Sequence, residues 1–253
     1  MLNVLRKSFR LINILRVFGY KKFTQELKLW GPKFYRNYIH EKYCKGFLEV
    51  DSDLIEDIDL RKSYDNFKSQ DYVKIPCGKE IVSKIHNLEV VSKQKDKDDR
   101  VKSDIAGFDN KFLEKHISSH AYQLLKLIIG RDFWIRDDAF IMHHGSDVGK
   151  KHFQSEWHVD GYNQITMQIL LEDSKQDPTC TEIMLGSSSK NWDFNRSNID
   201  NHQDFDVKGL YGKAGDIFIF FGGGALHRAK IGAGGRKALF INFSTGWYES
   251  GIF

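Results

Sequence analysis

The sequence predicts a mainly β domain of barrel or jelly-roll type, with flanking α-helices and an N-terminal helical segment before it. Two observations support this prediction. Up to residue 129, apolar residues recur mostly at helical spacing, whereas from residue 133 onwards short apolar or alternating runs are separated by glycine-rich turns. Hydrophobic residues make up 41% and aromatic residues 13% of the 253 residues, which favours a packed core over disorder.

Residues 1–50 differ in charge from the rest of the chain. They carry a net charge of +8, whereas residues 51–253 carry −4. Helical spacing predicts an amphipathic helix over residues 2–18 and a second over about residues 24–43, bent or divided at Gly31-Pro32. Such a segment can bind an anionic membrane surface or pack on the following domain, and both interpretations stay open. The acidic stretch of residues 51–59 marks the boundary, so we predict domains of residues 1–50 and 51–253.

The cysteines and the charge distribution indicate the compartment and the kind of partner. Cys44, Cys77 and Cys180 are odd in number and too far apart for a Cys-x-x-Cys motif, so we expect reduced thiols in a cytoplasmic protein. No uninterrupted apolar run approaches the roughly 18 residues that span a bilayer. Because the positive charge lies in residues 1–50, we expect no nucleic-acid partner, and only this segment is a candidate for peripheral membrane contact.

Helices dominate the predicted elements between residues 51 and 129. We predict a short helix over residues 64–69, a strand over residues 72–75 and a helix over residues 79–91. The densely charged residues 93–102 predict a solvated loop. Residues 110–129 predict one long helix with a single buried face, ended by Gly130. His116 and His120 lie four residues apart on this helix, but no third ligand is near, so we interpret them as surface histidines.

Strands dominate the remainder of the chain. Apolar runs predict strands over residues 133–143, 165–171, 181–185, 216–221 and 237–243. His143 and His144 end the first of these and face opposite ways, so at most one of them can line a cavity, and neither is counted as a ligand. Residues 186–210 lack clear periodicity, and loops of this length often act as lids or binding loops.

The pattern His-Val-Asp at residues 158–160 is the strongest indication of a metal site in the sequence. In an extended strand alternate side chains point the same way, so His158 and Asp160 share a face. With a second imidazole, for which His227 is the candidate, they would form the 2-His-1-carboxylate triad of non-haem Fe(II) oxygenases. A second His-x-Asp begins at His202, but it lies in a polar run with loop chemistry, so we favour His158.

Further motifs follow the His-x-Asp in a fixed order. They are Gly-Ser-Ser-Ser at residues 186–189, Gly-Asp and an apolar strand at residues 215–220, Leu-His at residues 226–227, and Gly-Arg-Lys-Ala-Leu at residues 235–239. This order, over roughly residues 67–247, resembles the phytanoyl-CoA dioxygenase family of Fe(II)- and 2-oxoglutarate-dependent oxygenases.

The resemblance implies a fold and a set of site residues. The fold is a double-stranded β-helix, a cupin-like jelly roll, and the iron ligands are His158, Asp160 and His227. Arg236 is implied as the anchor of the 2-oxoglutarate tail carboxylate, for which a planar bidentate donor is well suited. Gln168, from its position along its strand, is expected beside this co-substrate. Dioxygen is the other co-substrate.

Three departures from the family pattern bear on these assignments. The turn at residues 185–188 replaces Pro-Gly-Ser/Thr-His, Ala229 stands where a hydroxyl residue often helps to hold the carboxylate, and the spacing from His227 to Arg236 is slightly short. The remaining cations nearby therefore stay alternatives to Arg236, namely Arg228, Lys230 and Lys237. Asp160 argues against halogenation, because relatives that halogenate leave the carboxylate position vacant for a halide.

We therefore expect an enzyme, a 2-oxoglutarate-dependent dioxygenase that hydroxylates a small-molecule, acyl or lipid-linked substrate and releases succinate and CO2. Lys190 and Arg196 could meet the phosphate of such a substrate. The alternatives are a cupin-like protein that binds metal without turnover and an interaction module that acts through its basic N-terminal segment.

Overall fold

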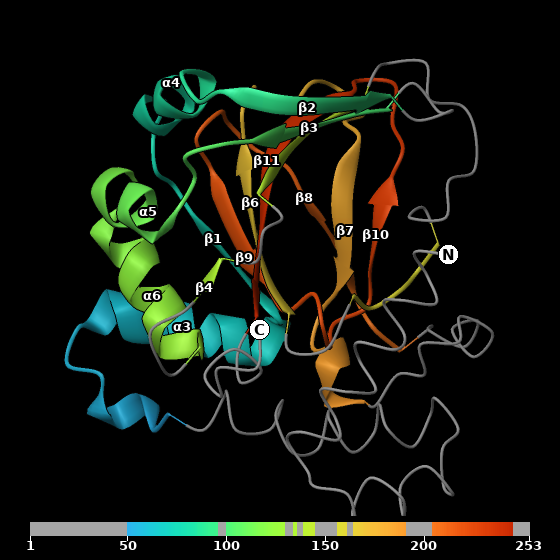
Figure 1. The fold of residues 1–253 in the computed structure, drawn as a ribbon. Helices are drawn as coiled ribbons and strands as arrows, with labels where there is room; N and C mark the ends of the chain where they lie inside the picture. The colour runs from blue at the N-terminus through green and yellow to red at the C-terminus, as the bar shows by residue number, and fades with distance from the viewer. Residues whose placement is uncertain are drawn as a thin grey trace, which may run out of the picture.

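Two antiparallel sheets and a group of helices make up the part of the chain that the structure describes (Figure 1). The computed structural model describes residues 50–95, 100–129, 134–135, 139–144, 156–160, 164–190 and 204–244. The helices predicted over residues 2–18 and 24–43 lie outside these residues, so the domain boundary stays a prediction. No helix in the described part of the chain is long and apolar enough to cross a membrane.

The larger sheet has eight strands and the smaller sheet has three. In spatial order the larger sheet contains β1 (Tyr72–Ile75), β9 (Ile217–Phe220), β6 (Gln164–Leu170), β11 (Arg236–Ser244), β5 (Phe140–His144), β3 (Arg100–Ile105) and β2 (Val90–Lys95), and β4 (Trp134–Ile135) pairs with β11. The smaller sheet contains β10 (His227–Lys230), β7 (Cys180–Met184) and β8 (Val207–Leu210).

The helices α3, α5 and α6 lie on the side of the larger sheet away from β7 and β10 (Figure 1). The helical elements are η3 (Ser52–Leu54), α3 (Ile58–Gln70), α4 (Glu80–His86), α5 (Asn110–His116), α6 (Ser119–Ile129) and η5 (Ser187–Ser189). Helix α3 begins where the side chain of Asp57 accepts hydrogen bonds from the amides of Asp59 and Leu60, and it ends at Asp71 in the left-handed conformation. Its buried Tyr64 and Phe67 join the main core.

The central strands explain why the larger sheet forms the middle of the molecule. All seven residues of β6 and all four of β9 are buried, because helices or the second sheet cover both faces. Apolar burial of this kind is the main favourable term in folding. The prediction of a mainly β, double-stranded β-helix with flanking helices is confirmed.

The prediction of a loop over residues 93–102 was wrong for residues 93–95 and 100–102, which are strand, while residues 96–99 lie outside the described part of the chain. Strands β2 and β3 pair with one another there, and β3 continues the larger sheet by pairing with β5. Strand β2 is the edge of the sheet and is exposed along almost all its length. Neither of its faces is buried, so its sequence lacks the alternation of apolar and polar residues from which a strand is predicted. Charged side chains are common on such edges because they oppose pairing with other chains.

The predicted helix over residues 110–129 is two helices, and that over residues 79–91 is shorter. Ile117 has an extended backbone, and the hydroxyl of Ser118 accepts a hydrogen bond from the amide of Ala121, which caps α6 as a new helix. Helix α4 ends at His86, and Val90 already belongs to β2.

The strand predictions also need correction. The strand predicted over residues 133–143 is two strands, β4 and β5, and the short strands β8 and β10 were not predicted. Strand β8 lies within residues 186–210, which were predicted to lack regular structure.

Candidate metal centre and co-substrate pocket

Backbone pairing brings the proposed metal ligands together. His158 and His227 form an antiparallel bridge, in which each amide donates to the other's carbonyl, at 3.0 Å and 2.9 Å. Two residues later, the amide of Asp160 donates to the carbonyl of Gly222 at 2.7 Å. The segment that precedes β6 is thus fixed against the start of β10, although the two are far apart in the sequence.

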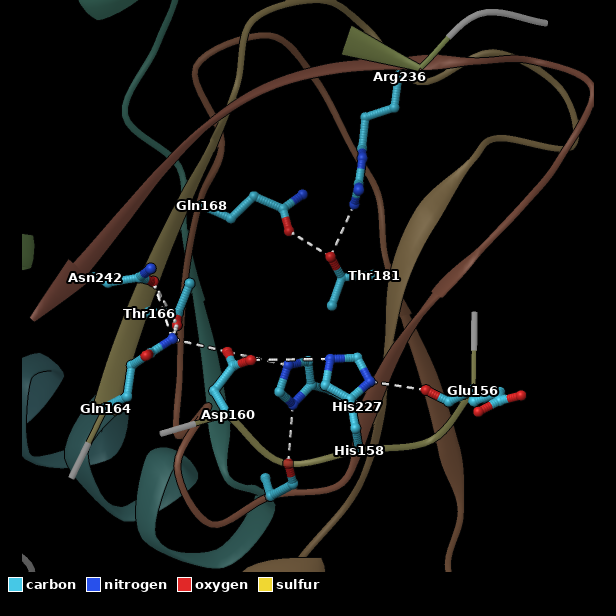
Figure 2. Close-up of polar contacts among 11 residues, drawn as sticks. Glu156, His158, Asp160, Gln164, Thr166, Gln168, Thr181, His227, Arg236 and Asn242 are labelled. Carbon is cyan, nitrogen blue, oxygen red and sulfur yellow. Dashed lines mark hydrogen bonds and ion pairs between the residues drawn. The ribbon is translucent and has the colours of Figure 1, made fainter. Parts of the chain in front are cut away.

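The three side chains point at one another (Figure 2). One ligand atom of each lies within 4.8 Å of the others, and His158, Asp160 and His227 are the group of this kind found among the described residues. The Nε2 atom of His227 is 3.3 Å from Oδ2 of Asp160, and the Nε2 atom of His158 is 3.9 Å from Oδ1. Adjacent ligands of an ion with bonds of about 2.1 Å lie roughly 3 Å apart, so the arrangement fits a metal ion with little movement.

Hydrogen bonds set the tautomers of both histidines. Nδ1 of His158 is 2.7 Å from the carbonyl of Glu156, and Nδ1 of His227 is 3.0 Å from the carbonyl of Ala225. A carbonyl only accepts, so each Nδ1 carries the proton, and Nε2 of the neutral ring presents a lone pair. Metal-binding histidines usually have such a partner for the second nitrogen.

The carboxylate of Asp160 is held by a polar network on the larger sheet. Nε2 of Gln164 donates to Oδ2 of Asp160 at 2.7 Å and lies 3.1 Å from both Thr166 Oγ1 and Asn242 Oδ1 (Figure 2). Gly222 leaves room for this contact, because a Cβ there would lie 3.0 Å from Oδ2 of Asp160 and 2.8 Å from Oγ1 of Thr166.

The pKa of His227 is raised above its ordinary value. Burial is the largest single influence and disfavours the charged ring, but the charge of Asp160, its hydrogen bond and the carbonyl of Ala225 together outweigh it. A site that raises the proton affinity of an imidazole also attracts a metal cation, and the two compete for Nε2.

A cavity of about 170 Å³ lies between the sheets and includes the three candidate ligands. Most of its lining comes from alternate strand residues, which face the interior together, and three consecutive residues of β10 add to it. These residues are Phe140, Met142, His144, His158, Asp160, Gln164, Thr166, Thr181, Phe220, His227, Arg228, Ala229, Arg236, Phe240 and Asn242.

Arg236 lies in the same cavity as the ligands and is only 7% exposed. Its Nη1 donates to Oγ1 of Thr181 at 2.8 Å, and this hydroxyl donates to Oε1 of Gln168 at 2.8 Å (Figure 2). Its Nε has no hydrogen-bond partner in the described part of the chain. Burial, first of all, lowers the pKa of the guanidinium to about 10, and Arg100 adds to the effect. Buried charges are normally paired, so a buried cation with only a neutral partner is a candidate binding site for an anion.

The other candidate cations are engaged elsewhere. Arg228 lines the cavity but forms an ion pair of 2.7 Å with Glu182. Lys230 pairs with Asp177 at 3.7 Å. Nζ of Lys237 lies 3.5 Å from Nε2 of His86, and Lys237 does not line the cavity. Geometry therefore favours Arg236 over these three as the anchor.

Thr181 was not predicted as a site residue. It lies directly opposite Ala229 in the pairing of β7 with β10. A hydroxyl therefore stands beside Arg236 even though residue 229 is alanine. Gln168, predicted beside the co-substrate, is fully buried and reaches the cavity through Thr181.

Several other histidine interpretations can be compared with the structure. His144 lines the cavity and His143 is exposed, as the alternation of a strand predicts. His116 packs against Phe112, while His120 bonds Ser63, so neither belongs to a metal cluster of the described residues. His202 lies outside the described residues.

The sequence contains a signal for the polar network that we did not use. Gln164, Thr166 and Gln168 occupy alternate positions in an otherwise apolar strand, and all three are buried. Polar residues on a single face of a buried strand indicate a functional site, because unpaired burial of polar groups is costly.

No protein-family model matches the chain, and no curated protein matches it either. Several solved structures are similar in fold. The non-heme alpha-ketoglutarate-dependent epimerase SnoN from nogalamycin biosynthesis is 12% identical over 74% of this chain and 83% of its own, with a TM-score of 0.50.

Two further similar structures hold bound molecules. HygX from Streptomyces hygroscopicus, with nickel, 2-oxoglutarate and hygromycin B, is 11% identical over 73% of this chain and 87% of its own, with a TM-score of 0.51. EctD from S. alaskensis, with 2-oxoglutarate and 5-hydroxyectoine, is 12% identical over 79% of this chain and 80% of its own, also with a TM-score of 0.51. The chain thus shares the double-stranded β-helix fold of the 2-oxoglutarate-dependent oxygenases.

Proposed function

We propose that the protein is an Fe(II)- and 2-oxoglutarate-dependent dioxygenase. One observation carries the proposal: a single cavity holds both a cluster of two histidines and a carboxylate and a buried arginine without a carboxylate partner among the described residues. A protein that only stores a metal ion has no use for the arginine, and burial of an unpaired cation is costly.

The donor set suits Fe(II). His158, Asp160 and His227 would hold the ion through two imidazole nitrogens and one carboxylate, which leaves positions for co-substrate and dioxygen. When bound, Fe(II) supplies dioxygen activation, coupled to oxidative decarboxylation of 2-oxoglutarate to succinate and CO2. Gln164 would orient the carboxylate of Asp160, and the carbonyls of Glu156 and Ala225 the two imidazoles.

Arg236 and Thr181 would bind the tail carboxylate of 2-oxoglutarate. The guanidinium supplies charge and donors, while the hydroxyl, which now donates to Gln168, can turn its proton to the carboxylate. Charge-assisted pairs of this kind are roughly twice as strong as neutral hydrogen bonds.

Hydroxylation of a small molecule is the reaction that we propose. Asp160 occupies the carboxylate position, which argues against halogenation, and the solved HygX and EctD complexes contain small molecules. Membership of the phytanoyl-CoA dioxygenase family is proposed from the motif order alone. SnoN, which has a similar fold, is an epimerase, so epimerisation is the alternative reaction.

A lipid-linked substrate and membrane contact through residues 1–50 are also proposals, motivated by the net charge of +8 in that segment. Vesicle flotation of the intact chain in low salt tests them. They are to be abandoned if vesicles rich in anionic lipid retain no protein.

The binding test of the proposed function is calorimetric titration of 2-oxoglutarate into anaerobic protein, with and without Fe(II). We expect the wild type to bind 2-oxoglutarate tightly, and only in the presence of Fe(II). Asp160→Ala should lose this binding. His143→Ala, at an exposed position, is the matched control and should keep it. Metal binding without any effect of 2-oxoglutarate would instead identify a cupin-like metal-binding protein.

A further inference from the structure

We propose that Asn242 is a substrate-binding residue, whose amide nitrogen donates a hydrogen bond to an acceptor oxygen of a substrate with an apolar body. This inference rests on the proposed oxygenase function and names the chemistry of its substrate. The apolar body would lie against Phe140 and Phe240, which line the same cavity.

The hydrogen bonds around Asn242 fix which way its amide points. The ionised carboxylate of Asp160 only accepts, so the nitrogen of Gln164 must face it, as it does at 2.7 Å. The same nitrogen is 3.1 Å from Oδ1 of Asn242, and the hydroxyl of Thr166 donates to that oxygen at 3.1 Å. Two donors thus hold the oxygen of Asn242, and a flipped amide would set its nitrogen against the nitrogen of Gln164 and lose that bond.

Because Oδ1 of Asn242 faces Gln164 and Thr166, its Nδ2 points away from these two residues. Asn242 lines the cavity and is half-buried. Its Nδ2 has no hydrogen-bond partner in the described part of the chain. The atom is not among the fully buried polar atoms that lack a partner, so it is accessible from the cavity that Asn242 lines and can donate to a ligand there.

The neighbours of Asn242 define the remainder of the ligand. Phe240 lies two residues earlier on β11 and so faces the same side. Its cross-strand partner is Phe140, and the two rings stack with centroids 5.7 Å apart and 16° between their planes. The guanidinium of Arg236 lies 5.1 Å from the Phe240 ring centroid, and Nζ of Lys102 lies 4.4 Å from that of Phe140, so cations border this pair of rings. A polar donor beside the two rings suits an aromatic or alicyclic body that carries a carbonyl, ether or hydroxyl oxygen.

A matched pair of probes tests this assignment. Acetophenone and α-methylstyrene have the same shape, but acetophenone has a carbonyl where α-methylstyrene has a methylene group. We would measure their dissociation constants by NMR with the protein loaded with Ni(II) and 2-oxoglutarate. One net hydrogen bond contributes about 0.5 to 1.5 kcal/mol, so the wild type should bind acetophenone about three- to tenfold more tightly.

The variant Asn242→Asp separates the donor from the packing. It keeps the shape and an oxygen that faces Gln164 and Thr166, but an oxygen replaces the nitrogen. The preference for acetophenone should vanish, while α-methylstyrene binds as before. Asn242→Ala, a second variant that cannot suffer repulsion from Asp160, should lose the preference in the same way, and His143→Ala should keep it.

Equal affinity of the two probes for the wild type overturns the assignment, as does a preference that survives in both Asn242 variants. The donor belongs to the chain alone, so the preference should also be measurable without Ni(II) and 2-oxoglutarate. A failure of the oxygenase proposal differs from a failure of the Asn242 assignment. In the first case the protein does not bind 2-oxoglutarate but still prefers acetophenone.

Discussion

His158, Asp160 and His227 form a preorganised candidate site because a second contact fixes each of the three side chains. Backbone carbonyls hold the two imidazoles, and Gln164 holds the carboxylate. Such outer contacts orient metal ligands and typically change metal affinity by ten- to a hundredfold. The spacing His-x-Asp was enough to predict that His158 and Asp160 lie together, although the two residues belong to no regular strand and only His158 forms an isolated bridge.

The first prediction concerns the outer contact on Asp160. Gln164→Leu removes the donor to the carboxylate but keeps the side-chain volume, so Fe(II) affinity should fall about ten- to a hundredfold while 2-oxoglutarate still binds the loaded enzyme. Metal titration measures the affinity, with Lys237→Ala, a substitution on the face of β11 opposite Arg236, as control. An unchanged Fe(II) affinity in the Leu variant would contradict this role of Gln164.

The second prediction concerns Arg236. Arg236→Ala should weaken 2-oxoglutarate binding by about 2 to 5 kcal/mol, roughly 30-fold or more, and should leave Fe(II) bound, because the residue is no ligand. Lys237→Ala, its neighbour on the opposite face of β11, is the matched control. Equal effects of the two substitutions would move the anchoring role away from Arg236.

Among the elements, the short strands near the site were the hardest to predict. In β10 the buried positions are His227 and Ala229, so the apolar alternation that marks a strand is missing where the site requires polar groups. In β2 the alternation is missing because the strand is an exposed edge. Long buried strands such as β6 carry the full signal and were predicted to within a residue.

The turn at residues 185–188, which stands in place of Pro-Gly-Ser/Thr-His, hydrogen-bonds to the residue that precedes β10. The hydroxyl of Ser187 accepts a hydrogen bond from the amide of Leu226, the residue before His227. Beside it, the amide and hydroxyl of Ser188 donate to the carboxylate of Asp71, which is 1% exposed. This polar cluster could not be predicted, because its members are far apart in the sequence.

The third prediction concerns the pH dependence of this cluster. Burial raises the pKa of Asp71 above its ordinary value of 3.8, although both contacts from Ser188 lower it. The folded state then binds the proton of Asp71 more tightly than the unfolded state. The residue therefore contributes less stability as the pH rises from the pKa of the unfolded state to the higher pKa of the folded state. Asp71→Asn cannot ionise, and its stability relative to the wild type should therefore increase from about pH 4 upwards.

Urea unfolding across this pH range checks the prediction. Asp65→Asn, at an exposed position on α3, is the control for the change from a carboxyl to an amide. Parallel profiles of the wild type and Asp71→Asn would show that the carboxyl of Asp71 does not titrate abnormally.

For the whole molecule, the fold class followed from the change in hydrophobic period near residue 130, but the arrangement of the strands did not. Strand β11 pairs with β6 and β5, and β9 lies between β1 and β6, so most pairings join segments that are distant in sequence. Periodicity carries no information on such pairings. The cavity exists only because these pairings place β5, β6, β10 and β11 around one space.

The fourth prediction follows from this arrangement. Fe(II) would join the segment of residues 158–160 to β10, and 2-oxoglutarate would join the metal to Arg236 on β11. A ligand at 100 times its dissociation constant stabilises the folded state by about 2.7 kcal/mol, which is roughly 5–10 °C in Tm for a chain of this size. Anaerobic thermal unfolding should show this increase in the wild type and none in His158→Ala. An equal increase in both would place the metal elsewhere.

Succinate formation from 2-oxoglutarate, measured in air with Fe(II), tests the central claim most directly. The account predicts Fe(II)-dependent release of equal amounts of succinate and CO2 by the wild type and by His143→Ala, and none by Asp160→Ala. Two results would contradict the assignment of the protein as a 2-oxoglutarate-dependent dioxygenase. One is that the metal-loaded wild type forms no succinate during prolonged incubation, and the other is that Asp160→Ala forms as much succinate as the wild type.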